Sequence, residues 1–525
     1  MKRILMLLII ILTLLSVAAV SADDNSTVIA DNPTAHEVAT VDDLPENNGE
    51  NTGELSSSNS TGIVSEEATG EEEPAVNKTP STITASNVIG YEEFTTTFKV
   101  KLTANGTALA SKQINIYLDG INYKMYTDSK GVVTLKLLMT KGTYTAQITY
   151  LGDDLTSNAT GTCKVTIKAP TKTKLKLGDK YINYRQGSKC LFYVKLVDAN
   201  NKAIKNQIVK FKVAGKTYSV KTNKNGNAKI YLNLKKGTYK IKYSFKKTSP
   251  YLASSGSYKI KVKAKMAKGN GYWLWPAHMK SVNLKKLSKK GTKHILLHVQ
   301  ALSVYGKSGV VSFIKKAHKY GMKVHLWMQV CYSGGKWVRP INDNNKIKYS
   351  FLNKKIKEAK KYAKIKGVDG IHFDYVRFGG TAHLYKDPNR AINYFMKKSS
   401  TQIHKVRPNC IVSAALMPEP SAMTYYYGQD VSTMSKYADA LIPMVYKGNY
   451  HQTRSWITSV TKAFVSQSNG AQIWTGLQSY HSDDNVKKLS HSTLIKDSKA
   501  AMKGGAKGVI LFRIGISHYL NFKKV

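Results

Sequence analysis

The C-terminal half of the chain alternates between two kinds of segment, and this alternation limits the fold more than any other feature. Short apolar segments rich in β-branched and aromatic residues alternate with longer stretches rich in Lys and Ala that have a helical period. We predict eight strands, over residues 272–275, 294–299, 324–329, 370–376, 411–417, 440–446, 473–478 and 508–514. Eight strands with intervening helices in about 260 residues are typical of an α/β (β/α)8 (TIM) barrel, which we expect over residues 265–525.

Two internal repeats precede the predicted barrel. The turn sequence TDSKG at residues 127–131 recurs as TNKNG at 222–226, and KGTY at 141–144 recurs at 236–239, with an offset of 95 residues in both cases. Segments with strand-like alternation lie between these turns. The repeat predicts two all-β Ig-like sandwiches, over residues 78–170 and 171–264, whose expected role is to space the barrel from its attachment. The fold class we expect is therefore multidomain, two β-sandwiches followed by a barrel.

The N-terminal segment predicts export. Lys2 and Arg3 precede an apolar run that ends in the small residues Val-Ser-Ala, which is the pattern of a secretory signal peptide over residues 1–22. An uncleaved anchor is the alternative, because the apolar run is nearly long enough to span a bilayer. Residues 23–77 contain no aromatic residue and are rich in Asp, Glu, Asn, Ser and Thr, so we expect a disordered acidic linker. The expected location is secreted or extracellular, in association with the cell wall.

The charge balance indicates an anionic partner. The chain carries 80 Lys and Arg residues against 33 Asp and Glu residues, a formal net charge of +47, and 14 of the acids lie between Asp23 and Glu73. A surface this basic attracts acidic polymers, and export favours a polysaccharide or cell-wall polymer over nucleic acid. Beyond the signal segment we expect no membrane contact. The four Cys residues have no CxxC spacing and indicate neither a disulfide scaffold nor a zinc site, so no metal or cofactor is expected.

The segment GVDGIHFDYVRFGG, residues 367–380, is the strongest functional signal. Its apolar strand is interrupted by His372 and Asp374, which lie two residues apart and therefore point to the same face. A carboxylate at the C-terminal end of a barrel strand is costly to bury and usually has a task. The alternative role for Asp374 is a simple ion pair with Arg377 or another cation.

Residues at the other strand ends complete a predicted rim. Glu419 follows the fifth strand between two prolines, so neighbouring strands would each carry a carboxylate at one rim, as glycoside hydrolysis requires. A solvated loop acid is the alternative role for Glu419. The substrate-binding candidates are Trp275, Gln329, Trp337, His372, Arg377, Tyr446, Tyr480 and Arg513. We expect Trp273, Trp327 and Trp474 in the core or the pocket wall.

A resemblance to a known family rests on three motifs. The segments DGIHFDYVRFGG, YYGQDVSTMSKYADALIPMVY and GLQSY resemble motifs of the predicted glycoside hydrolases of bacterial and archaeal cell surfaces, over about residues 271–515. That family is similar to the alpha-amylase superfamily, in which the fourth-strand Asp is the nucleophile and a fifth-strand Glu is the acid. The resemblance therefore implies that Asp374 is the nucleophile and Glu419 the acid/base. Asp430 and Asp439 match motif positions, and we count Asp430 with the substrate-binding candidates.

The resemblance also implies a reaction and has two departures. The expected reaction is retaining glycoside hydrolysis, in which Arg377 and His372 would hold Asp374 ionised and orient the sugar. Gly379 and Gly380 replace the proline of the family motif, which predicts a more flexible loop after the fourth strand, and Val431 stands where the family has Trp. The two β repeats resemble the Ig-like repeats of large archaeal and bacterial surface proteins.

Three other functions remain open on the sequence alone. His294 and His298 have the H-x-x-x-H spacing of a metal-dependent deacetylase, but they fall on a predicted strand without a nearby pair of Asp residues. A non-catalytic, adhesin-like protein that binds wall polymers would also fit the β repeats, the acidic linker and the charge. Peptide cleavage has the least support, because no Cys-His or Ser-His pairing stands out.

Overall fold

The computed structural model describes residues 77–525, so the predicted signal peptide and nearly all of the predicted acidic linker lie outside the described residues. The described chain divides into two compact units, and the second unit includes all of residues 164–525. Within residues 77–525 no helix has the length and apolar character needed to span a membrane.

The first β-rich segment contains two sheets. Its strands are β1 (Ser81–Ala85), β2 (Val88–Tyr91), β3 (Thr96–Ala104), β4 (Thr107–Ala108), β5 (Gln113–Leu118), β6 (Ile121–Tyr126), β7 (Val132–Leu137), β8 (Gly142–Tyr150) and β9 (Ala159–Lys168). One sheet has the order β1-β3-β4 with β7 paired to β3, and the other has the order β2-β9-β8-β5-β6. Buried and exposed residues alternate along β3, as expected for a strand with one face on a core.

The second β-rich segment repeats this organisation. Its strands are β10 (Thr173–Leu177), β11 (Cys190–Asp198), β12 (Ile208–Val213), β13 (Lys216–Lys221), β14 (Asn227–Leu232), β15 (Gly237–Phe245) and β16 (Ser254–Val262). The sheets β10-β11-β14 and β13-β12-β15-β16 share one core, in which Phe192 of β11 meets Phe211 of β12 edge to face at 6.0 Å. The predicted β-rich repeats are therefore present, and their immunoglobulin-like topology stays a prediction.

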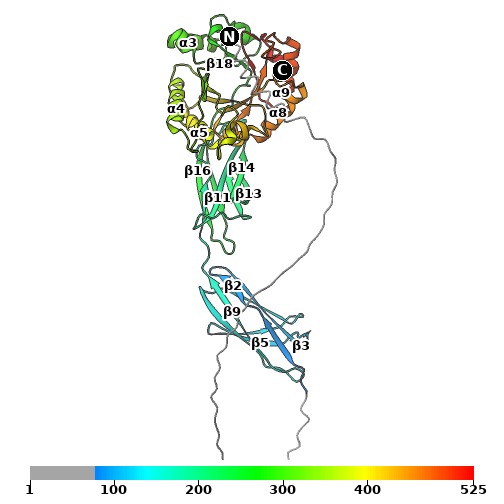
Figure 1. The fold of residues 1–525 in the computed structure, drawn as a ribbon. Helices are drawn as coiled ribbons and strands as arrows, with labels where there is room; N and C mark the ends of the chain where they lie inside the picture. Colours follow the sequence, from blue (N-terminus) through cyan, green and yellow to red (C-terminus); the bar gives the residue numbers. More distant parts are fainter. Residues whose placement is uncertain (1–76) are drawn as a thin grey trace, which may run out of the picture. The chain divides into compact units, whose positions relative to one another are not determined.

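Eight parallel strands close into a barrel in the C-terminal part of the chain, as predicted (Figure 1). They are β17 (Gly271–Leu274), β18 (His294–His298), β19 (Lys323–Gln329), β22 (Gly370–Asp374), β23 (Ile411–Leu416), β24 (Ala440–Val445), β25 (Gln472–Ile473) continued by β26 (Thr475–Gln478), and β27 (Val509–Phe512). The pairs β17–β27 and β23–β24 complete the circle. The seventh strand is divided at Trp474, which the sequence did not indicate.

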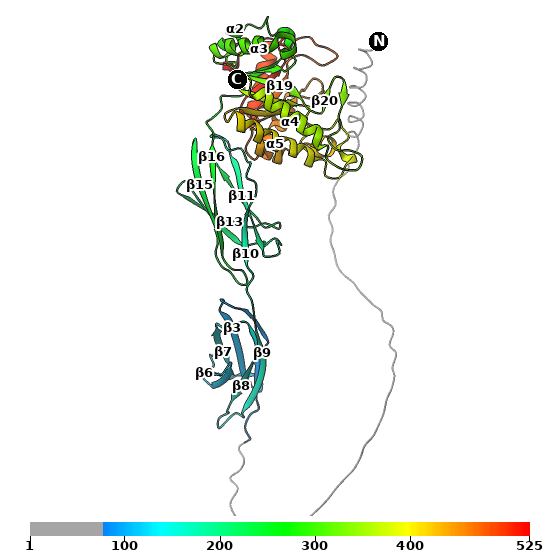
Figure 2. The same cartoon turned by 90° about the vertical axis from the view of Figure 1, so that its left-hand side faces the viewer.

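Helices surround the barrel. They are α2 (Leu284–Lys289), α3 (Ala301–Lys319), α4 (Tyr349–Ala363), α5 (Asn389–Val406), α6 (Met423–Tyr427), α7 (Val431–Tyr437), α8 (Arg454–Gln467) and α9 (His491–Lys503), with short 3-10 turns η1 (Pro276–His278), η2 (Ala382–Leu384) and η3 (Phe522–Lys524). Helix α4 buries Leu352, Ile356, Ala359 and Ala363, which recur on one helical face. Helices α4 and α5 pack side by side on the outside of the barrel (Figure 2).

Large side chains fill the barrel interior. Trp273, Trp327 and Trp474 are buried there together with Leu296 and Ile510, so the predicted core position of these tryptophans is confirmed. Residues that alternate with them, such as Ile295 and Leu297, belong to the outer core beneath the helices. The polar groups at the C-terminal strand ends therefore lie on a packed aromatic floor rather than over an open channel.

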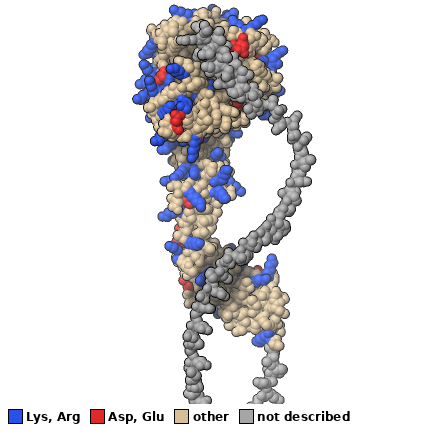
Figure 3. Space-filling view, in the orientation of Figure 1, with Lys and Arg blue, Asp and Glu red and all other residues tan. Residues whose placement is uncertain are grey.

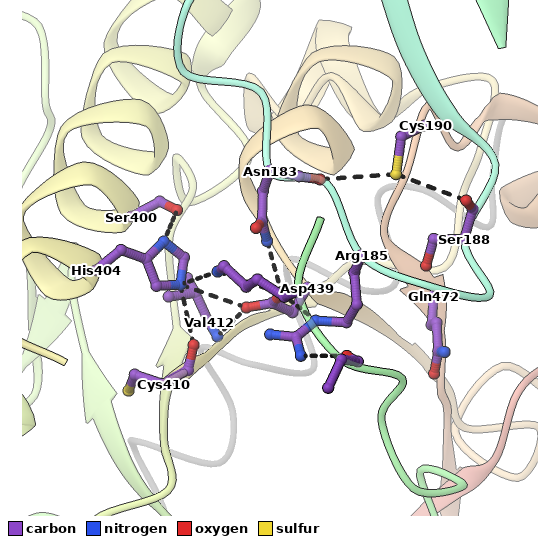
Figure 4. A network of polar contacts seen from close by, with 12 residues as sticks. Asn183, Arg185, Ser188, Cys190, Ser400, His404, Cys410, Val412, Asp439 and Gln472 are labelled. Atoms are coloured by element: carbon purple, nitrogen blue, oxygen red, sulfur yellow. Dashed lines mark hydrogen bonds and ion pairs between the residues drawn. The ribbon is translucent and has the colours of Figure 1, made fainter. Parts of the chain in front are cut away.

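The barrel and the second β-rich segment share a buried ion cluster around Asp439 (Figure 4). Asp439 precedes β24, at the N-terminal end of the strands. Its Oδ1 accepts hydrogen bonds from Asn183 Nδ2 at 2.6 Å and Arg185 Nε at 2.7 Å, and its Oδ2 accepts one from the Val412 N–H at 2.9 Å. Lys263 Nζ lies 3.9 Å from the same carboxylate. Asp439, whose role the motifs left undefined, is thus a structural anchor on the face of the barrel opposite the predicted rim.

Candidate active site

The predicted rim residues gather at the C-terminal ends of the barrel strands. Gln329 and Asp374 end β19 and β22, and Arg377 follows β22. The remaining residues follow the other strands within a few positions: Trp275, Glu419, Tyr446, Tyr480 and Arg513. Trp337 belongs to a two-stranded hairpin, β20 (Tyr332–Ser333) and β21 (Lys336–Trp337), in the loop after β19. Parallel strands in a barrel present these ends at one mouth, so residues far apart in the sequence share one site.

Asp374 is a buried carboxylate held by two donors. Its Oδ2 accepts a hydrogen bond from Trp327 Nε1 at 3.0 Å, and its Oδ1 accepts one from the Tyr375 backbone N–H at 2.8 Å. Burial raises the pKa of Asp374, and the two donors and the charge of Arg377 oppose that rise. Because both oxygens accept hydrogen bonds, the ionised form has the support that a nucleophile needs.

The chain turns sharply directly after Asp374. Tyr375 has φ 51°, in the left-handed region that a tyrosine rarely adopts. The Cys331 N–H donates to the Tyr375 carbonyl at 2.9 Å, and the Tyr375 ring stacks on Tyr332 at 4.8 Å. Contacts with the neighbouring loop therefore hold a strained residue beside the buried carboxylate.

Glu419 has one bonded and one unbonded oxygen. Its Oε1 accepts hydrogen bonds from Tyr450 OH at 2.7 Å and Tyr427 OH at 3.4 Å. Its Oε2 is shielded from solvent and has no hydrogen-bond partner within the described residues. Burial raises the pKa of Glu419, against the opposing effects of Tyr450 and Arg377. A raised pKa and a free oxygen are the properties of a carboxyl group that donates a proton.

Arg377 connects the two carboxylates electrostatically. Its positive charge lowers the pKa of both Asp374 and Glu419. The guanidinium lies over the Trp337 ring, 4.7 Å from its centroid, and 5.4 Å from the centroid of Tyr427. The aromatic rings and the hydrogen bond from Arg377 Nη1 to the Phe378 carbonyl hold the cation in place.

His372 does not have the role that the sequence predicted. It is completely buried one layer below Asp374, where its Nε2 accepts from Trp273 Nε1 at 3.1 Å and its Nδ1 lies 3.0 Å from Ser413 Oγ. Burial lowers the pKa of His372 to about 3, so the ring is neutral and cannot support the Asp374 charge. The predicted support comes from Arg377 instead.

Asp430 has a structural role in α7. Its Oδ1 caps the N-terminus of the helix, accepting hydrogen bonds from the Thr433 N–H and from Ser432 Oγ. The helix thus uses one oxygen of this carboxylate, and the substrate-binding role that the resemblance implied stays a prediction.

Two of the aromatic rim residues, Tyr446 and Tyr480, follow β24 and β26. The Tyr446 hydroxyl is buried without a hydrogen-bond partner among residues 77–525, and besides burial the nearby Tyr480 and Asp374 raise its pKa. Tyr446 packs on Phe512 at 5.8 Å, and Tyr480 OH donates to Asp483 at 2.6 Å. The unused Tyr446 hydroxyl is a donor available to a bound hydroxyl group.

A cavity of about 380 Å³ opens beside the carboxylates, at the ends of β17, β18 and β19. Its lining includes Trp275, His298, Gln300, Gln329, Lys355 and Glu358. Neither Asp374 nor Glu419 lines it, but Trp327 connects the two regions, because it contacts Trp275 at 5.1 Å and binds Asp374. The cavity has the mixed aromatic and polar lining of a small-molecule site.

Three contributors to the site were not predicted from the sequence. Trp327 was expected only as core or pocket wall, and Tyr427 and Tyr450 were not singled out. Their hydroxyls meet Glu419 although Tyr450 lies 31 residues away in the sequence. Two signals were available in the sequence: Tyr427 lies in the motif YYGQDVSTMSKYADALIPMVY, and Tyr450 lies four residues after Tyr446.

The two histidines of the H-x-x-x-H spacing do not share a site. His294 pairs with His325 at 3.0 Å in the lower layer of the barrel, whereas His298 packs on Trp275 at 4.3 Å near the mouth. In the described part of the chain, no three His, Cys, Asp or Glu side chains are arranged to hold a metal ion.

Solved structures similar to this chain include three enzymes of low sequence identity. The class V chitinase from Pseudomonas fluorescens Pf-5 is 14% identical, with 49% of this chain and 98% of that chain covered and a TM-score of 0.38. The spore cortex-lytic enzyme SleL from Bacillus megaterium QM B1551 is 13% identical, with 50% and 75% covered and a TM-score of 0.35. The exo-beta-1,4-mannosidase Op5Man5 from Opitutaceae bacterium strain TAV5 is 12% identical, with 46% and 51% covered and a TM-score of 0.35.

A family model matches part of the chain. No curated protein matches the chain. The family described as "Putative glycosyl hydrolase domain" matches residues 257–464. Asp374, Arg377, Glu419 and Tyr446 lie inside the matched range, and Tyr480 and Arg513 lie beyond it. The barrel of this chain thus contains a segment similar to a glycosyl hydrolase domain.

Proposed function

We propose that the chain is a glycoside hydrolase with Asp374 as nucleophile and Glu419 as acid/base. The proposal rests on two carboxylates that follow the neighbouring strands β22 and β23 and both feel the charge of Arg377; Asp374 is buried and Glu419 is partly buried. The similarity of residues 257–464 to a glycosyl hydrolase domain supports it. Paired carboxyl groups with different environments are what glycoside hydrolysis needs.

The two carboxylates differ in their hydrogen bonds, and this difference supports the role proposed for each. Donors occupy both oxygens of Asp374, which favours a carboxylate that attacks the anomeric carbon. Glu419 Oε2 has no partner in residues 77–525, and burial raises the pKa of Glu419, so this oxygen can carry a proton toward the leaving oxygen.

The reaction then takes two steps. An Asp374 oxygen bonds to the anomeric carbon while the glycosidic bond breaks and Glu419 gives its proton to the departing oxygen. A water molecule next gives a proton to Glu419 and its oxygen to the anomeric carbon, which releases Asp374. The Tyr446 hydroxyl and Arg377 orient the sugar over the aromatic floor.

The proposed substrate is an extracellular or cell-wall polysaccharide. Lys and Arg side chains are spread over the barrel and the second β-rich segment on the face shown in Figure 3, and such a surface attracts an anionic polymer. The signal-like residues 1–22 support export. The β-rich segments are proposed to space the enzyme from its attachment.

The first test measures new reducing ends from a panel of cell-wall and extracellular polysaccharides. Asp374→Asn and Glu419→Gln are each expected to lower the rate at least about 100-fold, because each removes a group that acts in the transition state. Asp484→Asn removes an exposed acid from a loop after β26 and should leave the rate unchanged.

Two outcomes would contradict the proposal. Full activity in Asp374→Asn would exclude Asp374 as nucleophile, and retained polymer without new ends from any protein would favour the non-catalytic, polymer-binding alternative. Proton NMR of the first-formed product separates retention from inversion at the anomeric carbon, and inversion would replace the nucleophilic role of Asp374 by that of a base.

A further inference from the structure

Arg513 has no polar partner, which sets it apart from the other arginines. Of the seven arginines in residues 77–525, the other six each bind an oxygen: Arg185 with Asp439, Arg339 with Asp343, Arg377 with the Phe378 carbonyl, Arg390 with the Asn345 carbonyl, Arg407 with the Ala363 carbonyl and Arg454 with Asp497. The guanidinium of Arg513 makes no hydrogen bond and no ion pair within the described part of the chain. Its five donors are therefore unused.

Arg513 lies at the mouth of the barrel, partly shielded from water. It follows β27 at the mouth and is half-buried, 6.0 Å from the ring centroids of both Trp275 and Phe512. Burial lowers the pKa of Arg513 from its usual high value, which reflects lost contact with water. The aromatic rings compensate part of that loss but offer no oxygen to the guanidinium.

Four acids at or near the mouth have other partners. Asp374 is bound by Trp327 and Tyr375, and Glu419 by Tyr450 and Tyr427. Asp483 accepts from Tyr480 and Asn449, and Glu358 accepts from Tyr362 and pairs with Lys355 at 3.5 Å. Among residues 77–525, the charge of Arg513 thus has no acidic partner.

We propose that Arg513 binds an anionic substituent of the substrate, a carboxylate or a phosphate, and so makes the barrel mouth select acidic sugars over neutral ones. A planar guanidinium binds such oxyanions through two parallel hydrogen bonds. Arg513 ends the eighth strand and Asp374 the fourth, on opposite sides of the barrel, and Trp327 and Phe512 form the floor between them at 6.3 Å. A sugar held over this floor presents its anomeric carbon to Asp374 and its charged group to Arg513.

This inference rests on the proposed function only in that the ligand is a glycan, and it is tested by binding. The full chain carrying Asp374→Asn, which prevents turnover, is titrated by calorimetry with three pairs of polymers. Polygalacturonate and hyaluronan are each compared with their carboxyl-reduced forms, and a phosphomannan is compared with its dephosphorylated form. Each pair differs only in the oxyanion.

Arg513→Gln is then added to the Asp374→Asn protein. It should reduce the ratio of the affinities for the acidic and the neutral polymer by roughly 10- to 100-fold in at least one pair, while the affinity for the neutral polymer is unchanged. If Arg513→Gln changes the preference within the polygalacturonate or hyaluronan pair, the ligand is a carboxylate. If it changes the preference within the phosphomannan pair, the ligand is a phosphate. The control Lys488→Gln removes one exposed charge from the loop after β26 and should change the preference slightly. The Arg513 effect should persist in about 0.5 M salt, where exposed charges are screened.

Arg513→Lys is the control for a folding defect, because it keeps the positive charge but lacks the planar guanidinium group. It should retain part of the preference and melt close to the parent protein. An unchanged preference in a folded Arg513→Gln protein, or no preference for any acidic polymer in the parent, would overturn the inference. Release of reducing ends by the chain with Asp374 intact is measured separately. Hydrolysis without a selectivity that depends on Arg513 contradicts only the inference. Selectivity without hydrolysis contradicts only the proposed function.

Discussion

At the scale of single residues, the environment of Asp374 depends on one side chain from the neighbouring strand. The indole N–H of Trp327 donates to Asp374 Oδ2 and favours the ionised carboxylate. Trp327→Phe keeps the aromatic floor but removes this donor, so the pKa of Asp374 should rise. Activity that depends on ionised Asp374 increases as pH rises through that pKa, and its acid limb should therefore move to higher pH.

We expect Trp327→Phe to lower kcat about 10-fold at neutral pH, because a hydrogen bond to a charged group is lost. The pH dependence of kcat/KM checks the direction of the shift. Trp474→Phe is the matched control, since Trp474 also donates its N–H inside the barrel but to Gln472 in the lower layer. An unshifted acid limb in Trp327→Phe, or an equal shift in Trp474→Phe, would contradict this role.

Residue patterns predicted the acids of the site better than their partners. Asp374 and Glu419 stood out because a carboxylate at a strand end is unusual, whereas Tyr427 and Tyr450 are ordinary loop tyrosines until the fold brings them to Glu419. His372 was misjudged because alternation along a strand gives the face of a side chain but not its depth. Its hydrogen bonds to Trp273 and Ser413 come from two other strands.

At the scale of elements, the eight strands were predictable because the apolar segments are separated by long helical stretches. The ends of the strands were harder to place. The fourth strand ends at Asp374 rather than Val376, since the left-handed conformation of Tyr375 breaks the extended backbone. This turn depends on contacts with the loop around Cys331 and Tyr332, so the sequence of the strand itself does not predict it.

The loop after the fourth strand holds a steric detail that explains its glycines. A Cβ on Gly379 would lie 2.8 Å from Trp337 Cδ2, so the missing side chain is what allows Trp337 to approach this loop and Arg377. Gly380 has φ 99°, and a Cβ there would meet nothing within 4 Å. The two glycines that predicted a flexible loop thus have different roles: Gly379 allows the close approach of Trp337, and Gly380 allows a backbone with positive φ.

Gly379→Ala should push the exposed Trp337 away from Arg377 and raise KM about 3- to 10-fold with little change in melting temperature. Steady-state kinetics and the tryptophan emission spectrum check this. Gly380→Ala is the contrasting control, because it strains the backbone without touching Trp337, and should lower stability more than it changes KM. Equal kinetic effects of the two variants would show that the position of Trp337 does not matter for binding.

At the scale of the whole molecule, the second β-rich segment is bound to the barrel by charge as well as by chain connection. Burial alone would raise the pKa of Asp439, but the charges of Lys263 and Arg185 hold it well below its ordinary value. A carboxyl group with a lowered pKa stabilises the fold above its unfolded pKa of about 3.9, and this contribution is lost as the pH falls toward the folded value. Sequence periodicity could not reveal this contact, because it joins residues about 250 positions apart.

The cluster predicts different effects of one substitution in two lengths of the chain. In residues 171–525, Asp439→Asn leaves Arg185 and Lys263 without their counter-charge and should lower stability by about 3–5 kcal/mol. In residues 266–525 those cations and the segment that covers Asp439 are absent, so the same substitution should change the melting temperature little. Scanning calorimetry on the four proteins compares the two changes. If the shorter chain does not fold, Arg185→Gln in residues 171–525 replaces it, because Asp439→Asn should then cost less than it does beside Arg185. An equal loss in both backgrounds would mean that Asp439 is not held by the second β-rich segment, which would then be a separable spacer.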